Sequence, residues 1–212
     1  MTIASAIGPG AGPALLVFAV AYLMGSIPFG LLLARIGGFG DIRQIGSGSI
    51  GATNVLRTGH KGIALLTMLC DIAKGIVPVL IVRLLWPDSP LFAASTGLFA
   101  VLGHLFPVWL RFKGGKGIAT AFGALVTVSW PVGVISAVVW FVLAALFRYS
   151  SLASLVAAAL TPFTAWHFLG TGPASVVAII AILVIALHHA NIRRLVRGQE
   201  SKITFRKPDP GH

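Results

Sequence analysis

The chain has 212 residues, of which 57% are hydrophobic and only 10% are charged, whereas soluble domains have about 45–50% and about 25%. The formal net charge is +11, yet a mean hydropathy of +0.94 leaves no segment for the soluble basic face that nucleic-acid binding requires. The composition therefore indicates an integral membrane protein and excludes a nucleic-acid partner. The single cysteine, Cys70, excludes a disulfide framework or a cysteine metal cluster.

Six apolar segments are candidates for membrane helices, because crossing a hydrocarbon core of about 30 Å takes roughly 20 apolar residues. The first has no Lys or Arg before it and no A-x-A-like cleavage site, so we interpret it as an uncleaved helix and not as a signal peptide. The fourth would extend about 45 Å, which is too long for one crossing. The segments are Ala14–Ile36, Ile63–Leu85, Leu91–Leu110, Ile118–Phe147, Leu152–Leu169 and Pro173–Ala190.

The middle of the fourth segment, Ser129–Gly133, combines Trp, Pro and Gly, which is typical of a turn at a membrane surface. Splitting the segment there predicts seven transmembrane helices, with the two termini on opposite sides. One side then holds only Arg83 and the other holds fourteen Lys and Arg residues, so the positive-inside rule places the N-terminus outside and the C-terminus in the cytoplasm. The cytoplasmic Lys and Arg residues are Arg35, Arg43, Arg57, Lys61, Arg111, Lys113, Lys116, Arg148, Arg193, Arg194, Arg197, Lys202, Arg206 and Lys207.

An alternative with six helices would leave the densest basic cluster, Arg193–Lys207, outside the cell.

In the seven-helix prediction the fourth helix, Ile118–Ser129, is short. We therefore expect the loop before it to sink below the membrane surface, which is allowed only where protein buries the backbone or a polar cavity lies beside it.

Two predicted cytoplasmic loops are rich in glycine. The first, Gly46–Asn54, matches G-x-G-x-x-G and is followed by Arg57, but no strand precedes it, so a dinucleotide site is not indicated. Glycines let successive N–H groups converge on an anion, and an Arg adds a bidentate phosphate partner. The second loop, Phe112–Thr120, lacks Walker A spacing but leads into a helix N-terminus beside Lys116. Both loops favour phosphate binding over the alternative of ordinary flexible loops.

Two further cytoplasmic stretches carry polar side chains. If the last helix continues past Ala190, His188 and Asn191 share one face while His189 points away. A histidine there also fits an ordinary interaction with the helix dipole. In the other stretch, Ser150 and Ser151 are candidate helix caps, and Ser154 is a candidate for a polar cavity.

Ionisable side chains within the apolar segments need partners. Asp71 and Lys74 lie three residues apart, so we expect a structural salt bridge near the cytoplasmic end of their helix.

Four segments together resemble the bacterial acyl-phosphate-dependent glycerol-3-phosphate acyltransferases, the PlsY family. They are Gly25-Ser26-Ile27-Pro28-Phe29-Gly30, the two glycine-rich loops, and the pattern His188-x-x-Asn191-Ile192-x-Arg194-Leu195-x-x-Gly198-x-Glu200. Their order matches the family, and they cover essentially the whole chain. One departure is Ser49, where the family usually has Asn.

The resemblance implies one seven-helix acyltransferase domain, residues 1–212, in the bacterial inner membrane with its active site on the cytoplasmic side. Such an enzyme transfers a fatty acyl group from acyl phosphate, and not from coenzyme A or acyl carrier protein, to the sn-1 hydroxyl of glycerol-3-phosphate. The product is 1-acyl-glycerol-3-phosphate, made in the first acylation of phospholipid synthesis. We expect membrane lipid around the protein, no obligate protein partner, no cofactor, and no metal, because the paired carboxylates of a magnesium site are absent from the sequence.

By the same resemblance, the catalytic residues are Ser47, His188 and Asn191. The expected phosphate-binding residues are Gly48, Ser49, Thr53, Asn54, Arg57, Gly114, Gly115, Lys116 and Ser154. An acyl phosphate carries its own leaving group, so no covalent enzyme intermediate is needed, and catalysis rests on positioning and on charge neutralisation. The proton acceptor stays open between His188 and a phosphate oxygen of a substrate.

Two other classes of protein fit the sequence less well than the enzyme. A transporter of an organic phosphate would need polar groups along a path through the midplane, whereas the external halves of the predicted helices are almost wholly apolar. A non-catalytic membrane scaffold would not need glycine-rich basic loops on one face.

Overall fold

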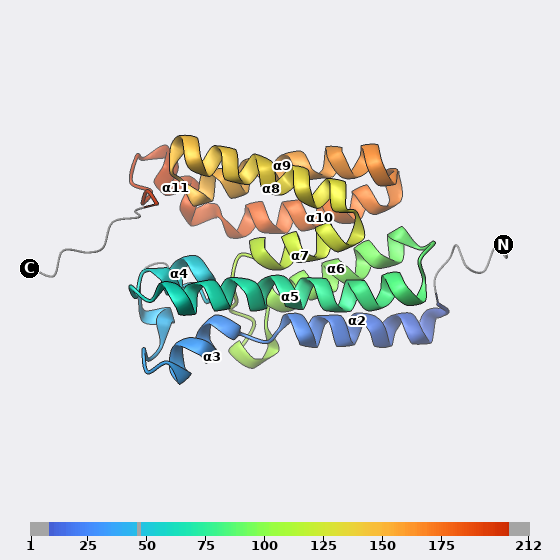
Figure 1. The fold of residues 1–212 in the computed structure, drawn as a ribbon, viewed down its shortest axis with the longest axis horizontal. Coiled ribbons are helices and arrows are strands. Elements are labelled where there is room, and N and C mark those ends of the chain that lie inside the picture. The colour runs from blue at the N-terminus through green and yellow to red at the C-terminus, as the bar shows by residue number, and fades with distance from the viewer. Residues whose placement is uncertain (1–8, 46–47, 204–212) are drawn as a thin grey trace, which may run out of the picture.

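The computed structural model describes residues 9–45 and 48–203. Ser47, Arg206 and Lys207, which figure in the predictions above, lie outside these ranges. The described residues form α-helices and short 3-10 turns with no strand, which confirms the all-helical fold class (Figure 1).

The elements are α2 (Ala11–Gly25), α3 (Phe29–Ile36), η1 (Ile42–Gln44), α4 (Ala52–Leu56), α5 (Lys61–Leu85), α6 (Pro90–Leu105), η2 (Val108–Leu110), α7 (Ile118–Val128), α8 (Trp130–Phe147), α9 (Ser150–Leu169), α10 (Thr171–Leu187) and α11 (His189–Val196). The predicted turn over Ser129–Gly133 is shorter in the structure: Ser129 alone separates α7 from α8, and Trp130–Gly133 begin α8. The first predicted segment is broken between α2 and α3, because Pro28 has no N–H to continue the helix.

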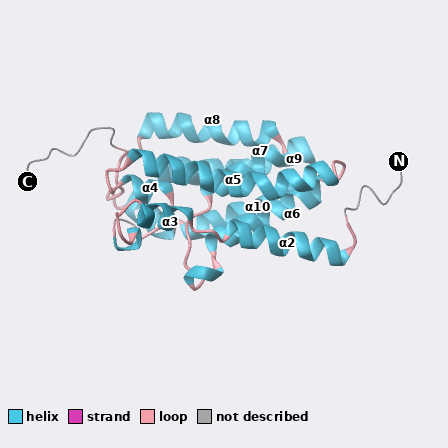
Figure 2. Cartoon of the chain, turned by 60° about the horizontal axis from the view of Figure 1, so that its bottom comes forward, coloured by secondary structure: helices cyan, strands magenta, loops and turns pink. Residues whose placement is uncertain are grey.

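The long helices run roughly side by side along one axis of the molecule (Figures 1 and 2). Helices α2, α5 and α6 pack together as one group, and α8, α9 and α10 as another. The short helix α7 lies between the groups and packs on α5, α6 and α8. The first turn of α2 and helix α11 lie at opposite ends of the bundle (Figure 1).

Five stretches of the described chain are long and apolar enough to cross a membrane: Ala11–Ile36, Lys61–Leu85, Pro90–Leu110, Trp130–Phe147 and Ser150–Leu169. The pair α10–α11, bent by 58°, makes a sixth when it is counted as one span. Helix α7 is apolar but has only 11 residues, about 16 Å at 1.5 Å per residue. These findings establish several membrane-length apolar helices, and the seven crossings remain a prediction.

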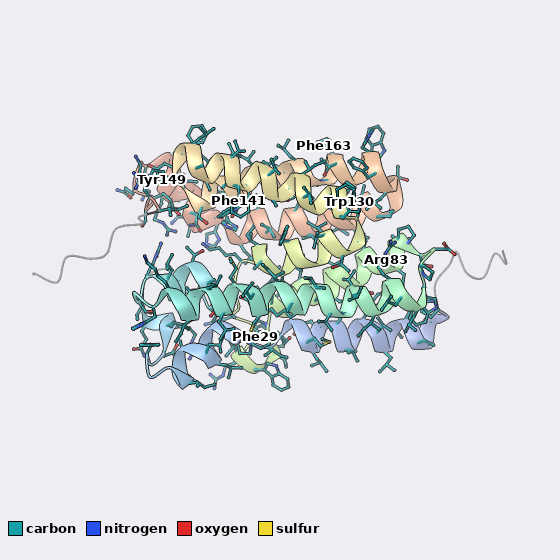
Figure 3. All side chains as sticks on the ribbon, in the orientation of Figure 1. Phe29, Arg83, Trp130, Phe141, Tyr149 and Phe163 are labelled. Carbon is teal, nitrogen blue, oxygen red and sulfur yellow. The ribbon has the colours of Figure 1, made fainter. Side chains whose placement is uncertain are left out.

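Large apolar side chains cover the outside of this bundle, and small residues fill much of its inside. Trp130, Phe141 and Phe163, labelled in Figure 3, are each at least 66% exposed. Glycines let helices approach closely: a Cβ on Gly75 of α5 would lie 2.1 Å from the Thr120 carbonyl of α7, and a Cβ on Gly103 would lie 2.1 Å from the Tyr22 carbonyl of α2. Close approach at small residues is the usual packing of helices that lie in lipid.

The connection from α6 to α7 lies within the length of the bundle and not at its end. Both helices stop short of the end at which α4 and α11 lie (Figure 1). Gly115 and Gly117 of the connection are buried. This burial meets the condition for a loop that sinks below the membrane surface, and the depth of the loop in a membrane stays a prediction.

The glycine packing between α5 and α7 predicts a sharp difference between two alanine variants of α5. Gly75→Ala places a methyl group against a backbone carbonyl, and overpacking of this kind costs about 1–3 kcal/mol. Gly62→Ala meets no atom within 4 Å, and alanine is the better helix former by about 0.5–1 kcal/mol. In detergent, Gly75→Ala should lower the melting temperature and Gly62→Ala should leave it equal or higher. Equal melting temperatures for both variants would contradict the packing.

Candidate active site

One end of the bundle gathers the polar loops of the chain. Helices α3, α4 and α11 lie there, together with the turn between α8 and α9 that contains Tyr149 (Figures 1 and 3). Arg83 lies at the opposite end (Figure 3). This arrangement agrees with the one-sided distribution of basic residues in the sequence.

A cavity of about 1220 Å³ enters the bundle from this end. Arg57, Lys116, His188, Asn191 and Glu200 line its polar part. Its other walls are mostly apolar, with the side chains Phe122, Leu125, Phe141, Ile180 and Val184 from α7, α8 and α10. The polar side chains Asp71, His104, Ser136 and Thr161 also line the cavity. The cavity can therefore hold a molecule that has a charged head and a long apolar tail.

A second, smaller cavity of about 220 Å³ lies beside the first. Both cavities are lined by Ser49, Lys116 and Asn191, so these three residues stand at their common boundary. Gly48, Gly114, Gly115, His189 and Arg194 are among the other residues of the small cavity. Two cavities that meet at one ammonium group can hold two anions side by side.

A chain of hydrogen bonds fixes Lys116. Its Nζ donates to Asn191 Oδ1 at 2.5 Å, and Asn191 Nδ2 donates to Glu200 Oε1 at 2.6 Å. Glu200 also accepts from Ser151 Oγ at 2.8 Å and, through Oε2, from Arg194 Nε at 2.6 Å. The Glu200 carboxylate therefore orients the amide of Asn191 so that its oxygen faces the lysine.

Burial and neighbouring charges shift the pKa values of Lys116 and Glu200. Burial lowers the pKa of Lys116 to about 8, the Glu200 carboxylate opposes this shift, and Arg194 and Arg57 add to it. Burial raises the pKa of Glu200, but hydrogen bonds from Asn191, Arg194 and Ser151 outweigh it, so the pKa lies below the usual range. The Lys116 ammonium therefore loses its proton at a lower pH than an exposed lysine does.

His188 sits at a break in the last helix. Helix α10 ends at Leu187 and α11 begins at His189 with a bend of 58°, so the expectation of a continuous helix is wrong. The expected separation of the histidines holds for the large cavity, which His188, 2% exposed, lines and His189 does not. His189 is exposed but lines the small cavity. His188 Nδ1 lies 2.7 Å from the Val184 carbonyl. A carbonyl only accepts, so Nδ1 carries the proton and Nε2 of the neutral ring is an acceptor.

In the second glycine-rich loop, Gly114 and Gly115 pack on the end of α6. Gly114 N–H donates to the Leu105 carbonyl and Gly115 N–H donates to the His104 carbonyl, both at 3.1 Å. Both N–H groups therefore already have partners within the protein, and the phosphate binding expected of Gly114 and Gly115 stays a prediction. Both residues line the small cavity, and a Cβ on either would lie 2.1 Å from an atom of His104. Their lack of a side chain lets the loop pack on the end of α6 and present Lys116.

The first glycine-rich loop contributes from Gly48 onward. Gly48 has φ +68°, and Ser49 Oγ accepts from the Gly51 N–H at 3.4 Å. Thr53 and Arg57 line the large cavity. Asn54 also borders the cavity, but its amide is buried and donates to the Ile42 carbonyl at 2.8 Å, so it holds the loop in place.

The serines of α9 fit the predictions only in part: no side chain caps the start of α9, so the capping expected of Ser150 is wrong, whereas Ser154 lines the cavity as expected. Ser151 bonds to Glu200 and not to the helix end, so the capping expected of it is wrong. Ser154 is buried, lines the large cavity and accepts a hydrogen bond from Trp140 Nε1 at 3.0 Å. It thereby joins α9 to α8 at the cavity wall.

Reasoning from the sequence missed Glu200 as a site residue, although it stands in the C-terminal pattern. The available signal was its isolation, since it is the only acidic residue between Asp88 and Asp209 and follows three arginines. A lone carboxylate in a basic segment has to serve as a partner for those charges.

Comparisons with known proteins agree with this site. The model of the family described as "Glycerol-3-phosphate acyltransferase" matches residues 15–198. The glycerol-3-phosphate acyltransferase of Bartonella henselae is 49% identical over 191 residues, covering 89% of this chain and 90% of that protein. That of Caulobacter vibrioides is 53% identical over 193 residues, covering 88% of this chain and 86% of the other.

Solved structures give the same result. The crystal structure of PlsY, an integral membrane glycerol 3-phosphate acyltransferase, in its glycerol 3-phosphate form has a TM-score of 0.86 and 39% identity, covering 91% of this chain and 96% of that chain. Its lysophosphatidic acid form has a TM-score of 0.83 and 38% identity over the same shares. The resemblance seen in the motifs is confirmed, and this chain is a member of the glycerol-3-phosphate acyltransferase family.

Proposed function

We propose that this protein transfers a fatty acyl group from acyl phosphate to the sn-1 hydroxyl of glycerol-3-phosphate. The observation that carries this proposal is the large cavity, in which a basic end with Arg57 and Lys116 continues into an apolar channel. An acyl phosphate has the same two parts, an anionic head and an alkyl chain. The glycerol 3-phosphate and lysophosphatidic acid forms of the related PlsY structure support the acceptor and the product.

The reaction needs two phosphates held together and no covalent intermediate. The sn-1 oxygen attacks the acyl carbonyl carbon, the bond from that carbon to the phosphate oxygen breaks, and the electron pair leaves with phosphate. Lys116 stands at the boundary of both cavities and can neutralise charge as phosphate departs. The site also lowers the activation barrier by holding the hydroxyl against the carbonyl, because two bound reactants need not meet by diffusion.

The site residues then have separate tasks. Arg57 and Lys116 bind the phosphates, with Gly48, Ser49 and Thr53 from the first loop, and Ser47 joins the catalytic set by family resemblance. Asn191 orients Lys116, and His188 Nε2 accepts a hydrogen bond from the hydroxyl. Asn54, Gly114, Gly115 and Ser154 shape the loops and the cavity wall. The proton ends on His188 or on an oxygen of a substrate phosphate, and variants of His188 distinguish the two.

The proposed location is the bacterial inner membrane, with seven crossings, the N-terminus outside and the active site facing the cytoplasm. In support, the first turn of α2 and helix α11 lie at opposite ends of the bundle (Figure 1). Helix α7 would complete its crossing through the partly buried loop that precedes it. Helices α3, α4 and α11 lie at one end and carry or adjoin Arg35, Arg57, Arg193 and Arg194, whereas Arg83 lies at the other end.

The donor is tested with purified protein, glycerol-3-phosphate and either palmitoyl phosphate or palmitoyl-CoA. We expect 1-palmitoyl-glycerol-3-phosphate and inorganic phosphate in equal amounts from palmitoyl phosphate, and no product from palmitoyl-CoA. Turnover with palmitoyl-CoA alone would contradict the proposed donor.

The orientation is tested with single cysteines in a Cys70→Ser background. Gly10→Cys and Gln199→Cys place thiols at exposed positions at the two ends of the bundle. In intact spheroplasts, an impermeant maleimide should label Gly10→Cys, and it should reach Gln199→Cys only after lysis. Labelling of both in intact spheroplasts would mean an even number of crossings.

The pKa of Lys116 predicts how the rate depends on pH. Its charged form is present below about pH 8 and is lost above it, so kcat/KM for glycerol-3-phosphate should fall as the pH rises through about 8. Lys116→Arg, whose guanidinium stays protonated, should remove this fall. Lys113→Arg changes an exposed lysine in the same loop and should keep it. An unchanged decline in an active Lys116→Arg enzyme would rule out Lys116 as its source.

The two histidines serve as controls for each other. His188→Ala should lower kcat by about a hundredfold or more, as loss of a positioned acid–base group does. His189 borders only the small cavity, and its exposed ring bonds to the Ala186 carbonyl, so His189→Ala should lower kcat far less. His188→Gln with substantial activity would assign the proton to a phosphate oxygen. Equal losses in the two alanine variants would refute the assignment of His188.

A further inference from the structure

Three ionisable side chains are buried together in the bundle. Asp71, Lys74 and His104 are 2%, 3% and 3% exposed. Lys74 Nζ lies 2.8 Å from Asp71 Oδ1, which confirms the salt bridge predicted from the sequence, and His104 Nδ1 lies 3.6 Å from the same oxygen. Charges inside a membrane bundle are costly, so their presence calls for a role.

The lysine connects this cluster to the first glycine-rich loop. Lys74 Nζ donates to the Ile27 carbonyl at 2.9 Å, at the break between α2 and α3. Gly30, in the first turn of α3, packs against the carbonyl of Ile50, where a Cβ would lie only 2.0 Å away. Lys74 therefore holds the chain segment on which the Gly48–Asn54 loop rests.

The histidine connects the same cluster to the second loop. The His104 carbonyl accepts the Gly115 N–H at 3.1 Å, and a Cβ on Gly115 would lie 2.1 Å from His104 Nε2. Lys116 is the next residue. Any movement of the His104 ring would therefore displace Gly115, and with it the ammonium group that stands between the two cavities.

We propose that Asp71 is a positioning residue for the acyl transfer, because it fixes both phosphate-binding loops at once. Its salt bridge holds Lys74, which supports the base of the first loop. Its carboxylate also faces His104 Nδ1 at 3.6 Å, without a hydrogen bond, and the His104 ring packs against Gly115 of the second loop. The ionic cluster thus sets the distance between Arg57 and Lys116, which come from different loops. The catalytic part of this proposal rests on the proposed function, while the structural part does not.

The test compares Asp71→Asn with Thr67→Val in full-length purified protein. Thr67 is buried in the same helix, one turn away, and its hydroxyl has no hydrogen-bond partner among the described residues, so Thr67→Val is a control with the same shape. Hydrogen exchange of peptides that cover 48–54 and 112–117 is followed together with kcat and KM for glycerol-3-phosphate. Asp71→Asn should speed exchange in both peptides at least tenfold and raise KM at least tenfold, and Thr67→Val should change neither.

A double variant keeps the test decisive if Asp71→Asn does not fold. Asp71→Asn with Lys74→Met removes both charges, and neutral replacements of buried ion pairs are often tolerated, yet exchange in both loops should still be faster. Unchanged exchange in either folded variant would overturn the proposal, as would a fall in kcat alone with KM unchanged. Hydrogen exchange is measured without substrate turnover. If the wild-type protein does not transfer acyl groups, the exchange result therefore still tests the link between Asp71 and the two loops.

Discussion

The buried ammonium of Lys116 is the constraint on which the site depends. An ammonium group placed in a largely apolar bundle must have partners, and here the partner is the amide of Asn191, which Glu200 orients. The carboxylate is held in turn by Arg194 and Ser151, so that α7, α9 and α11 meet at one point. Burial lowers the pKa of Lys116 to about 8. The protein therefore stabilises the charge of this ammonium only in part, and a bound phosphate would supply the missing partner.

Short helices and a loop that reaches back into the bundle bring this lysine to a cavity with an apolar extension. Helices α6 and α7 are short, with 16 and 11 residues, and the loop between them reaches back into the bundle. Gly114 and Gly115 allow this loop to pack on His104. Because α7 is short, the cavity continues beside it, between α5 and the group of α8, α9 and α10. A single packing arrangement thus supplies both the cationic end and the space for an alkyl chain.

The sequence predicted much of this arrangement, for physical reasons that can be named. Long apolar runs and the Trp-Pro-Gly turn after Ser129 were enough for the helices, and the glycine-rich loops were enough to indicate anion binding. The break at His188 was not predictable, because the residues around it fit a continuous helix. The roles of Gly114 and Gly115 depend on the position of His104, and that of Glu200 on the fold of the C-terminal segment, which are tertiary contacts without a local pattern.

The most direct measurement is a structure of this protein with glycerol-3-phosphate bound. We predict that the phosphate lies in hydrogen-bond contact, within about 3 Å, of both Lys116 Nζ and the Arg57 guanidinium, with the sn-1 hydroxyl directed toward His188 and the apolar channel. A phosphate bound away from Lys116, with the sn-1 hydroxyl remote from His188, would contradict the arrangement of the site.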